Sequence, residues 1–171
     1  MSNAAAQDPS APEAPSISVS GQYVKDFSFE NPNAPESLAS DAPQPQIEVN
    51  VDVQARGFRN NMYEVVLRIH GHCRQAENTA FVVELDYAGL FVLRNFEQGH
   101  LEQACLIECP RLLFPFARTI IANTTRDGGF PPLLLDPIDF NQLYQRSRAT
   151  QAGAGQAAAD QGATDQGADE S

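Results

Sequence analysis

Four segments of the chain alternate apolar and polar residues with a period of two, and this pattern constrains the fold most strongly. The segments are SISVSGQYVKDFSFE (16–30), QIEVNVDVQARGF (46–58), MYEVVLRIHGHC (62–73) and NTAFVVELDYAGLFVL (78–93). Successive side chains of a β-strand point to opposite faces, so this alternation predicts four strands. The polar connections 59–61 and 74–78 have hairpin length, whereas the proline-rich stretch 31–45 is long enough to cross the sheet. We therefore expect a four-stranded antiparallel sheet with one crossover connection.

The same alternation sorts the side chains of the predicted strands onto two faces. One face is apolar and should be the core face: Tyr23, Phe27, Phe29, Ile47, Val49, Val51, Val53, Tyr63, Val65, Leu67, Ile69, Phe81, Val83, Leu85 and Tyr87. The other face carries acids, three valines and one arginine: Asp26, Glu30, Glu48, Asp52, Glu64, Glu84, Asp86, Val24, Val66, Val82 and Arg68. Lys25 is in phase with the core residues, which requires a β-bulge or an edge position. Ordinary solvation explains an acidic face, and a basic partner is the alternative explanation.

Residues 100–129 predict a long helix that ends at the Gly128–Gly129 pair and is kinked or broken by Pro110 and Pro115. Apolar residues cover most of its circumference, so one sheet cannot bury them all and a symmetric oligomer is expected. Three prolines make 130–137 an irregular apolar loop, and a shorter second helix should follow. The predicted fold class is α+β, with the sheet packed against both helices.

The two ends of the chain differ in composition from this patterned part. Residues 1–15 are rich in Ala, Pro and Ser, and residues 149–171 repeat Ala, Gly, Gln and Asp. Such composition predicts disordered tails, the second of them acidic, on either side of one domain at 16–148.

Charge and cysteine content exclude some classes of function. Against 22 acidic residues there are 11 basic ones, and the net charge of −11 argues against nucleic-acid binding. The N-terminus has no basic patch followed by an apolar run, and no stretch has the length of a membrane span. The odd number of cysteines, three, suggests a reducing compartment. We expect a cytoplasmic protein that is not inserted in a membrane.

Several longer motifs carry a resemblance to a known family. YVKDFSFENPNAP, YEVVLRI, TAFVVEL, CPRLLFPFAR and GGFPPLLLDPIDF occur in this order between about residues 17 and 148 and resemble SecB, the protein-export chaperone family. The resemblance implies a homotetramer, a dimer of dimers with the long helices packed between two sheets. It also implies that the protein holds unfolded precursor proteins and delivers them to the SecA ATPase.

The resemblance also implies roles for particular residues. Asp26, Glu30, Val82 and Glu84 match the positions at which the family docks SecA. Phe130, Leu133 and Leu135 are expected to contact the client. Because no phosphate-binding loop of the Walker type is present, we expect neither ATP use nor enzymatic activity, and no cofactor.

Two alternatives from other classes remain at this point. The cluster His70, His72 and Cys73, together with Cys105 and Cys109, has residue types that bind metals, although no CxxC or HExxH motif is present. A structural oligomer without clients is the other alternative. Suppression of aggregation without ATP would separate a chaperone from both.

Overall fold

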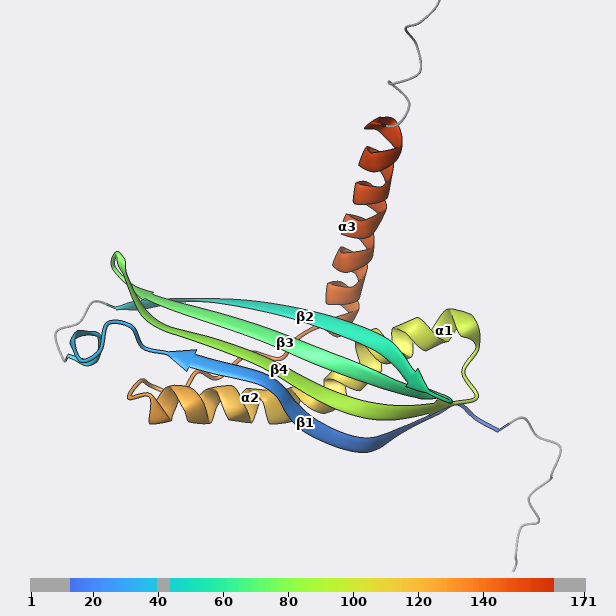
Figure 1. The fold of residues 1–171 in the computed structure, drawn as a ribbon, viewed down its shortest axis with the longest axis horizontal. Coiled ribbons are helices and arrows are strands. Elements are labelled where there is room, and N and C mark those ends of the chain that lie inside the picture. Colours follow the sequence, from blue (N-terminus) through green and yellow to red (C-terminus); the bar gives the residue numbers. More distant parts are fainter. Residues whose placement is uncertain (1–12, 40–43, 162–171) are drawn as a thin grey trace, which may run out of the picture.

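The computed structural model describes residues 13–39 and 44–161 of the chain, with side chains described up to residue 150. Its centre is one antiparallel sheet of four strands: β1 (Ser16–Glu30), β2 (Pro45–Arg59), β3 (Met62–Gln75) and β4 (Asn78–Arg94). The strand order is β1-β4-β3-β2, so β1 and β2 form the two edges although they are consecutive in the chain (Figure 1). The segment that joins them contains a short 3-10 helix, Glu36–Leu38.

Two tight hairpins connect the last three strands, as the sequence predicted. Arg59 lies opposite Met62, and Gln75 lies opposite Asn78, so each loop has two residues. Asn61 and Ala76 have positive φ angles of 53° and 50° in these loops. Positive φ values suit the right-handed twist of a hairpin, and the extended pairing that follows aligns β2, β3 and β4 along most of their length.

The predicted long helix is a run of three helical elements: α1 (Gln98–Gln103), the π-helical turn η2 (Ala104–Glu108) and α2 (Cys109–Asp127). The interruption expected at Pro110 takes the form of this π turn, which lies directly before it. A proline has no N–H for the regular helical bond, and a π turn is one way to accommodate that loss. Pro115 lies inside α2 without ending it, and the helix stops at Gly128 as predicted.

A second helix, α3 (Phe140–Gln161), follows the irregular segment 130–139. Its first turn is capped by Asp139, whose Oδ1 accepts hydrogen bonds from the backbone N–H groups of Asn141 and Gln142 at 3.0 and 3.1 Å. The helix continues past Arg148, where we placed the start of the C-terminal tail. Alanine has the highest helix propensity, which favours this continuation into the Ala-rich sequence. Residues 1–12 and 162–171 of the expected tails lie outside the described residues.

The hydrophobic core lies between the inner face of the sheet and α2. The sheet contributes Val65, Leu67, Ile69, Phe81, Val83 and Leu85, all nearly inaccessible to solvent, and α2 contributes Leu113, Ala117 and Ile121. A row of aromatic rings, Phe29, Phe81 and Phe130, extends this core, with centroid separations of 5.7 and 4.8 Å. The central strands thus have the core face that the alternation predicted.

A bulge in the edge strand β1 accounts for the phase of Lys25. The register shifts between Val24, which faces Tyr87, and Asp26, which faces Asp86, so Lys25 is the extra residue. The shift corrects two assignments: Val24 lies on the inner side and Tyr23 on the outer side, the reverse of the prediction. Simple alternation fails before the bulge because one added residue exchanges the faces.

Inner-face residues of the two edge strands are more exposed to solvent than their assignment to the core face predicted. Phe27, Ile47 and Val49 belong to the inner face by register, yet each is about two-fifths exposed. In the described chain the helices cover the central strands and leave the inner side of both edges partly open. None of the helices within the described residues has the length and apolar character needed to cross a bilayer.

Candidate functional site

The outer face of the sheet is the face turned away from α2. Register determines its members, because directly opposed residues of an antiparallel sheet point to the same side. The outer face consists of Tyr23, Asp26, Ser28 and Glu30 of β1; Val82, Glu84, Asp86 and Ala88 of β4; Glu64, Val66, Arg68, His70 and His72 of β3; and Glu48, Asn50, Asp52, Gln54 and Arg56 of β2. The acids that the sequence placed on this face are all there.

The four residues matched to SecA docking lie together at one end of this face. Asp26 is opposite Asp86, and Glu30 is opposite Val82. Glu84 lies between these pairs, across from Ser28 of β1, and 57% of its side-chain surface is exposed. We call this group, Asp26, Glu30, Val82 and Glu84, the acidic end of the outer face.

The ion pairs of the outer face leave the acidic end largely unneutralised. Arg68 donates to both carboxylate oxygens of Asp86 at 2.9 to 3.2 Å, and Arg74 donates to Glu48 at 2.6 Å. Within the described residues, Asp26 and Glu30 form no ion pair, and the partner of Glu84 is the imidazole of His70 at 3.5 Å. Three exposed carboxylates therefore lie beside the half-buried Val82, without a described lysine or arginine bound to any of them.

A different arrangement surrounds Glu64, farther along the outer face. The Glu64 carboxylate accepts hydrogen bonds from the Tyr23 hydroxyl, from the Lys25 ammonium at 2.9 and 3.0 Å, and from the Arg56 guanidinium. We call these four residues the Glu64 cluster. It links β1, β3 and β2 across β4, in which Ala88 is opposite Tyr23 and Leu90 is opposite Glu64.

Electrostatics in the Glu64 cluster favour the ionised carboxylate. Burial alone would raise the pKa of Glu64, but the hydrogen bonds from Tyr23, Lys25 and Arg56 outweigh it and lower the pKa to about 2. The hydrogen bond that Tyr23 donates to Glu64 raises the pKa of the Tyr23 hydroxyl. Sequence patterning did not identify this cluster, because its donors come from both edges of the sheet and meet only through the bulge at Lys25.

The three residues expected to contact a client have unequal exposure. Phe130 and Leu135 are buried at 9% and 6% exposure and belong to the core, and Leu133 is half-buried against β3 near Gly71. The Thr125 hydroxyl of α2 accepts a hydrogen bond from the Leu133 N–H at 2.9 Å and fixes this segment on the core. Leu134, which is not among the predicted client contacts, is 62% exposed. An irregular segment has no periodicity from which its exposed residue could have been chosen.

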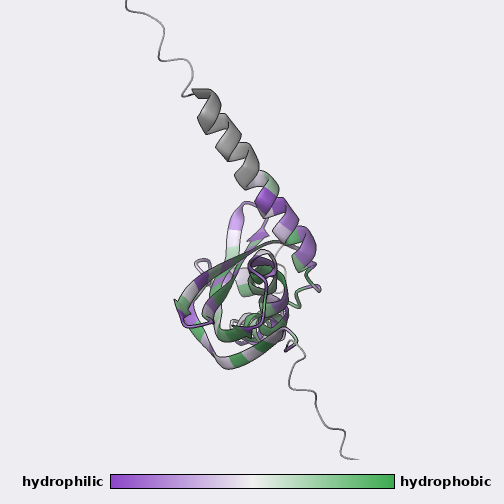
Figure 2. Cartoon of the chain, turned by 90° about the vertical axis from the view of Figure 1, so that its right-hand side faces the viewer, coloured by the Kyte–Doolittle hydropathy of each residue, from purple (hydrophilic) through white to green (hydrophobic). Residues whose placement is uncertain are grey.

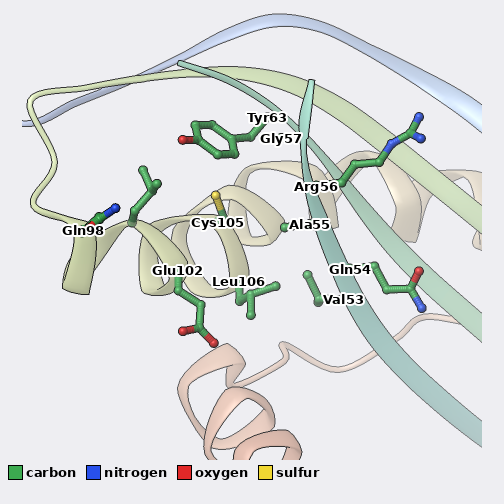
Figure 3. Close-up of a pocket in the computed structure, with 11 residues that line it drawn as sticks. Val53, Gln54, Ala55, Arg56, Gly57, Tyr63, Gln98, Glu102, Cys105 and Leu106 are labelled. Carbon is green, nitrogen blue, oxygen red and sulfur yellow. The ribbon is translucent and has the colours of Figure 1, made fainter. Parts of the chain in front are cut away.

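A cavity of about 610 Å³ opens between the edge strand β2 and the helical run that begins at α1. Tyr63, Cys105 and Leu106 contribute apolar lining, and Gln98 and Glu102 contribute polar lining (Figure 3). Leu101 also lines the cavity. Gln54 and Arg56 border it from β2 but project to the other side of the strand, toward the outer face. No strand among the described residues pairs with the free edge of β2, so unpaired backbone groups lie beside a cavity whose lining is partly apolar and partly polar.

Apolar surface is also exposed on α2. Viewed along the sheet, the strands curve around the helices, and apolar and polar residues alternate along them (Figure 2). On α2, Leu112 and Phe116 are 44% and 52% exposed, although the opposite side of this helix is fully buried. The helix thus has the two apolar sides expected from its sequence, and the sheet covers one of them.

The structure separates the residues of the metal-site alternative. His70 and His72 lie on the outer face, whereas Cys73 is buried on the inner face opposite Ile47. Burial raises the pKa of Cys105 to about 11 and also raises that of Cys109, which keeps both thiols protonated. Within the described part of the chain, no three His, Cys, Asp or Glu side chains converge on a possible metal position.

Comparison with known proteins matches this chain to one family over most of its length. Residues 10–151 fit the family model described as preprotein translocase subunit SecB. The protein-export protein SecB of a Bradyrhizobium species is 49% identical over 154 residues, covering 90% of this chain and 95% of that protein. Its counterpart in Xanthobacter autotrophicus is 52% identical over 145 residues, covering 85% and 92%.

A solved structure supports the fold independently. The SecB-like chaperone Rv1957 of Mycobacterium tuberculosis, in complex with a peptide from the HigA1 antitoxin, superposes with a TM-score of 0.60. The superposition covers 71% of this chain and 90% of that one at 14% identity, so the likeness concerns the fold. With the family model and relatives at about half identity agreeing over the strands and helices described above, the chain belongs to the SecB family.

Proposed function

We propose that this protein is an ATP-independent chaperone that binds unfolded precursor proteins, keeps them competent for export and delivers them to the SecA ATPase in the cytoplasm. Membership of the SecB family makes it a chaperone for preprotein export. The observation that carries the delivery step is the acidic end of the outer face, where three carboxylates have no lysine or arginine partner among the described residues.

The acidic end is the proposed docking surface for SecA. A basic partner would bind here through complementary charge. Asp26, Glu30 and Glu84 have no arginine or lysine partner among the described residues, so no strong ion pair has to be broken first. Val82, opposite Glu30, adds an apolar contact at one end of the group. By contrast, Asp86 and Glu48 are already bound by Arg68 and Arg74, which makes them poorer sites for a new cation.

The proposed client surface combines the cavity at β2 with the exposed Leu134. Unfolded chains expose apolar side chains and backbone groups, and the free edge of β2 beside a cavity with apolar residues in its lining suits both. Burial of apolar surface contributes about 25 cal/mol per Å² without recognition of a particular sequence. Binding of this kind needs neither nucleotide nor catalytic residues.

Oligomerisation would cover the remaining apolar surface of α2. We propose a homotetramer, a dimer of dimers in which the α2 helices pack between two sheets. Leu112 and Phe116 support this arrangement, because they form an exposed apolar side on a helix whose other side is fully buried. Several client surfaces on one particle would increase avidity for a long unfolded chain.

Light scattering of a denatured protein that refolds with and without the chaperone tests the holding activity. We expect suppression of aggregation in the absence of ATP, and weaker suppression by the Leu134→Ser variant, because this leucine is exposed. Thr119→Ser, an exposed substitution on α2, is the matched control. Unchanged aggregation in the presence of excess wild-type protein would contradict the proposed chaperone function, whereas a loss of suppression equal in both variants would contradict the role of Leu134.

A further inference from the structure

Two histidines of β3 lie beside the acidic end: His72 is opposite Val82, and His70 is opposite the docking carboxylate Glu84. His70 of β3 lies directly opposite Glu84 of β4, and its Nε2 is 3.5 Å from Oε1 of Glu84. Histidine is the side chain whose charge ordinarily changes between about pH 5 and 8. We propose that His70 makes the docking surface pH-sensitive: when protonated it pairs with Glu84 and weakens docking of a basic partner, and when neutral it leaves Glu84 free. The inference rests on the docking surface proposed above.

Among the charged groups around His70, the acids of β2 and Asp86 of β4 have other partners, which leaves Glu84 as the carboxylate that His70 can bind. On the neighbouring strands and on β3 itself, these groups are Glu48 and Asp52 of β2, Glu84 and Asp86 of β4, and Arg68 and His72 of β3, with Asp26 and Glu30 of β1 one strand farther. Arg74 holds Glu48, Arg68 holds Asp86, and the side chain of Gln54 donates to Asp52 at 3.3 Å. Arginine stays charged at every pH of interest, so these contacts do not change with pH.

Protonation of His70 therefore changes the charge of the docking surface at one place. The added positive charge forms an ion pair with Glu84 and also reduces the field of the nearby Asp26 and Glu30. Both effects oppose a basic partner, so docking should weaken as the pH falls. His70 is 42% exposed and Glu84 57% exposed, and exposed pairs have modest strength, which corresponds to a roughly two- to fivefold change in affinity.

His72 provides a matched control on the same strand and the same face. Its Nε2 lies 3.1 Å from the Thr79 hydroxyl, and within the described residues it forms no ion pair with an acid. Protonation of His72 therefore creates no new ion pair with Glu84. The structure thus contains two histidines in similar positions, of which one lies against a docking carboxylate.

The test measures binding of labelled SecA by fluorescence anisotropy at about pH 8 and about pH 6. His70→Gln is neutral at both values, and His70→Lys is positive at both. At each pH, the wild-type dissociation constant is divided by that of His70→Gln. Any effect of the titration of SecA on binding is common to both constants and cancels in this ratio. We expect this ratio to rise roughly two- to fivefold from pH 8 to pH 6. His70→Lys should bind weakly at both values, and His72→Gln should keep the pH dependence of the wild type.

Two outcomes would overturn the inference and are distinguishable. If Glu84→Gln weakens docking at pH 8 but the ratio of wild type to His70→Gln stays constant with pH, the docking surface stands and the role of His70 is wrong. If Glu84→Gln leaves docking unchanged, the docking surface itself is wrong, and the inference is overturned with it. Thermal melts of each variant verify that the substitution leaves the protein folded.

Discussion

Glu64 and Glu84 are both acids on the outer face of the same sheet, yet their surroundings are opposite. Three side chains from β1 and β2 donate to Glu64, and 4% of its side chain is exposed. Glu84 has one imidazole neighbour and is 57% exposed. A carboxylate with saturated acceptors holds strands together, whereas one with free acceptors is available to a partner. The comparison separates a structural part of the acidic face from the part that we propose as a docking surface.

Glu64→Gln should have the largest effect on stability. The amide cannot balance Lys25 and Arg56, which would remain as charges beside a buried neutral group. Because Lys25 and Arg56 are 38% and 67% exposed and can be hydrated, the lost charged hydrogen bonds cost about 2 kcal/mol of the free energy of unfolding. Urea denaturation followed by circular dichroism measures it. A change below about 0.5 kcal/mol, the usual effect of a surface substitution, would show that the cluster does not stabilise the sheet.

Acid should remove the same contribution from the wild type. Because the folded pKa of Glu64 is lowered from 4.5 to about 2, its stabilisation is present above about pH 4.5 and is lost as the pH falls toward 2. The wild-type advantage over Glu64→Gln should therefore shrink between these values. Denaturation series at several pH values compare the two proteins. A difference that stays constant over this range would mean that Glu64 titrates normally in the folded protein.

Lys25→Met should have a smaller effect, because Glu64 keeps two of its three donors. The loss of a charged hydrogen bond at a partly exposed position corresponds to about 1 kcal/mol of the free energy of unfolding. Arg56→Met is the matched variant from the other edge of the sheet. If neither substitution lowers the free energy of unfolding, the interpretation of the cluster as a link between the two edges of the sheet fails.

Glu84→Gln should have the smallest effect on stability, within about 0.5 kcal/mol. The substitution leaves no buried donor without an acceptor, and it removes repulsion from the neighbouring Asp86 and Asp26. Urea denaturation beside Glu64→Gln completes the comparison between the two carboxylates. A loss as large as that of Glu64→Gln would give Glu84 a structural role and weaken the case for a docking surface.

The sequence was sufficient for the sheet, because the apolar residues of β3 and β4 keep one phase throughout, although Val66 and Val82 add apolar residues to the polar face. Alternation assigned Tyr23 and Val24 to the wrong faces, which shows the limit of predicting faces from alternation alone. A bulge has no signature in the alternation except one residue out of phase, which in this chain was Lys25. That residue indicated a bulge or an edge, and the structure contains both.

The candidate sites were predictable where they lie on regular strands. Asp26, Glu30, Val82 and Glu84 gather as expected, since strand register fixes their positions. Burial of a particular acid was not predictable, because it depends on long side chains from distant strands that cover Glu64. The same limit applies to Leu134 and Leu135, adjacent residues of an irregular segment, of which one is exposed and the other buried. Their exposure depends on how this segment packs on the core.

Charge reversal at the acidic end tests the central claim most directly. Titration calorimetry would measure SecA binding to the wild type, to Asp26→Lys with Glu84→Lys, and to Glu48→Lys with Asp52→Lys, which changes the net charge equally at the other edge. We predict that the first double variant loses about 2 kcal/mol of binding free energy or more, about thirtyfold in affinity, while the second loses much less. Wild-type binding should weaken with added salt, since the interacting charges are exposed. Equal affinity of the first variant and the wild type, or an equal loss in both variants, would contradict docking at the acidic end.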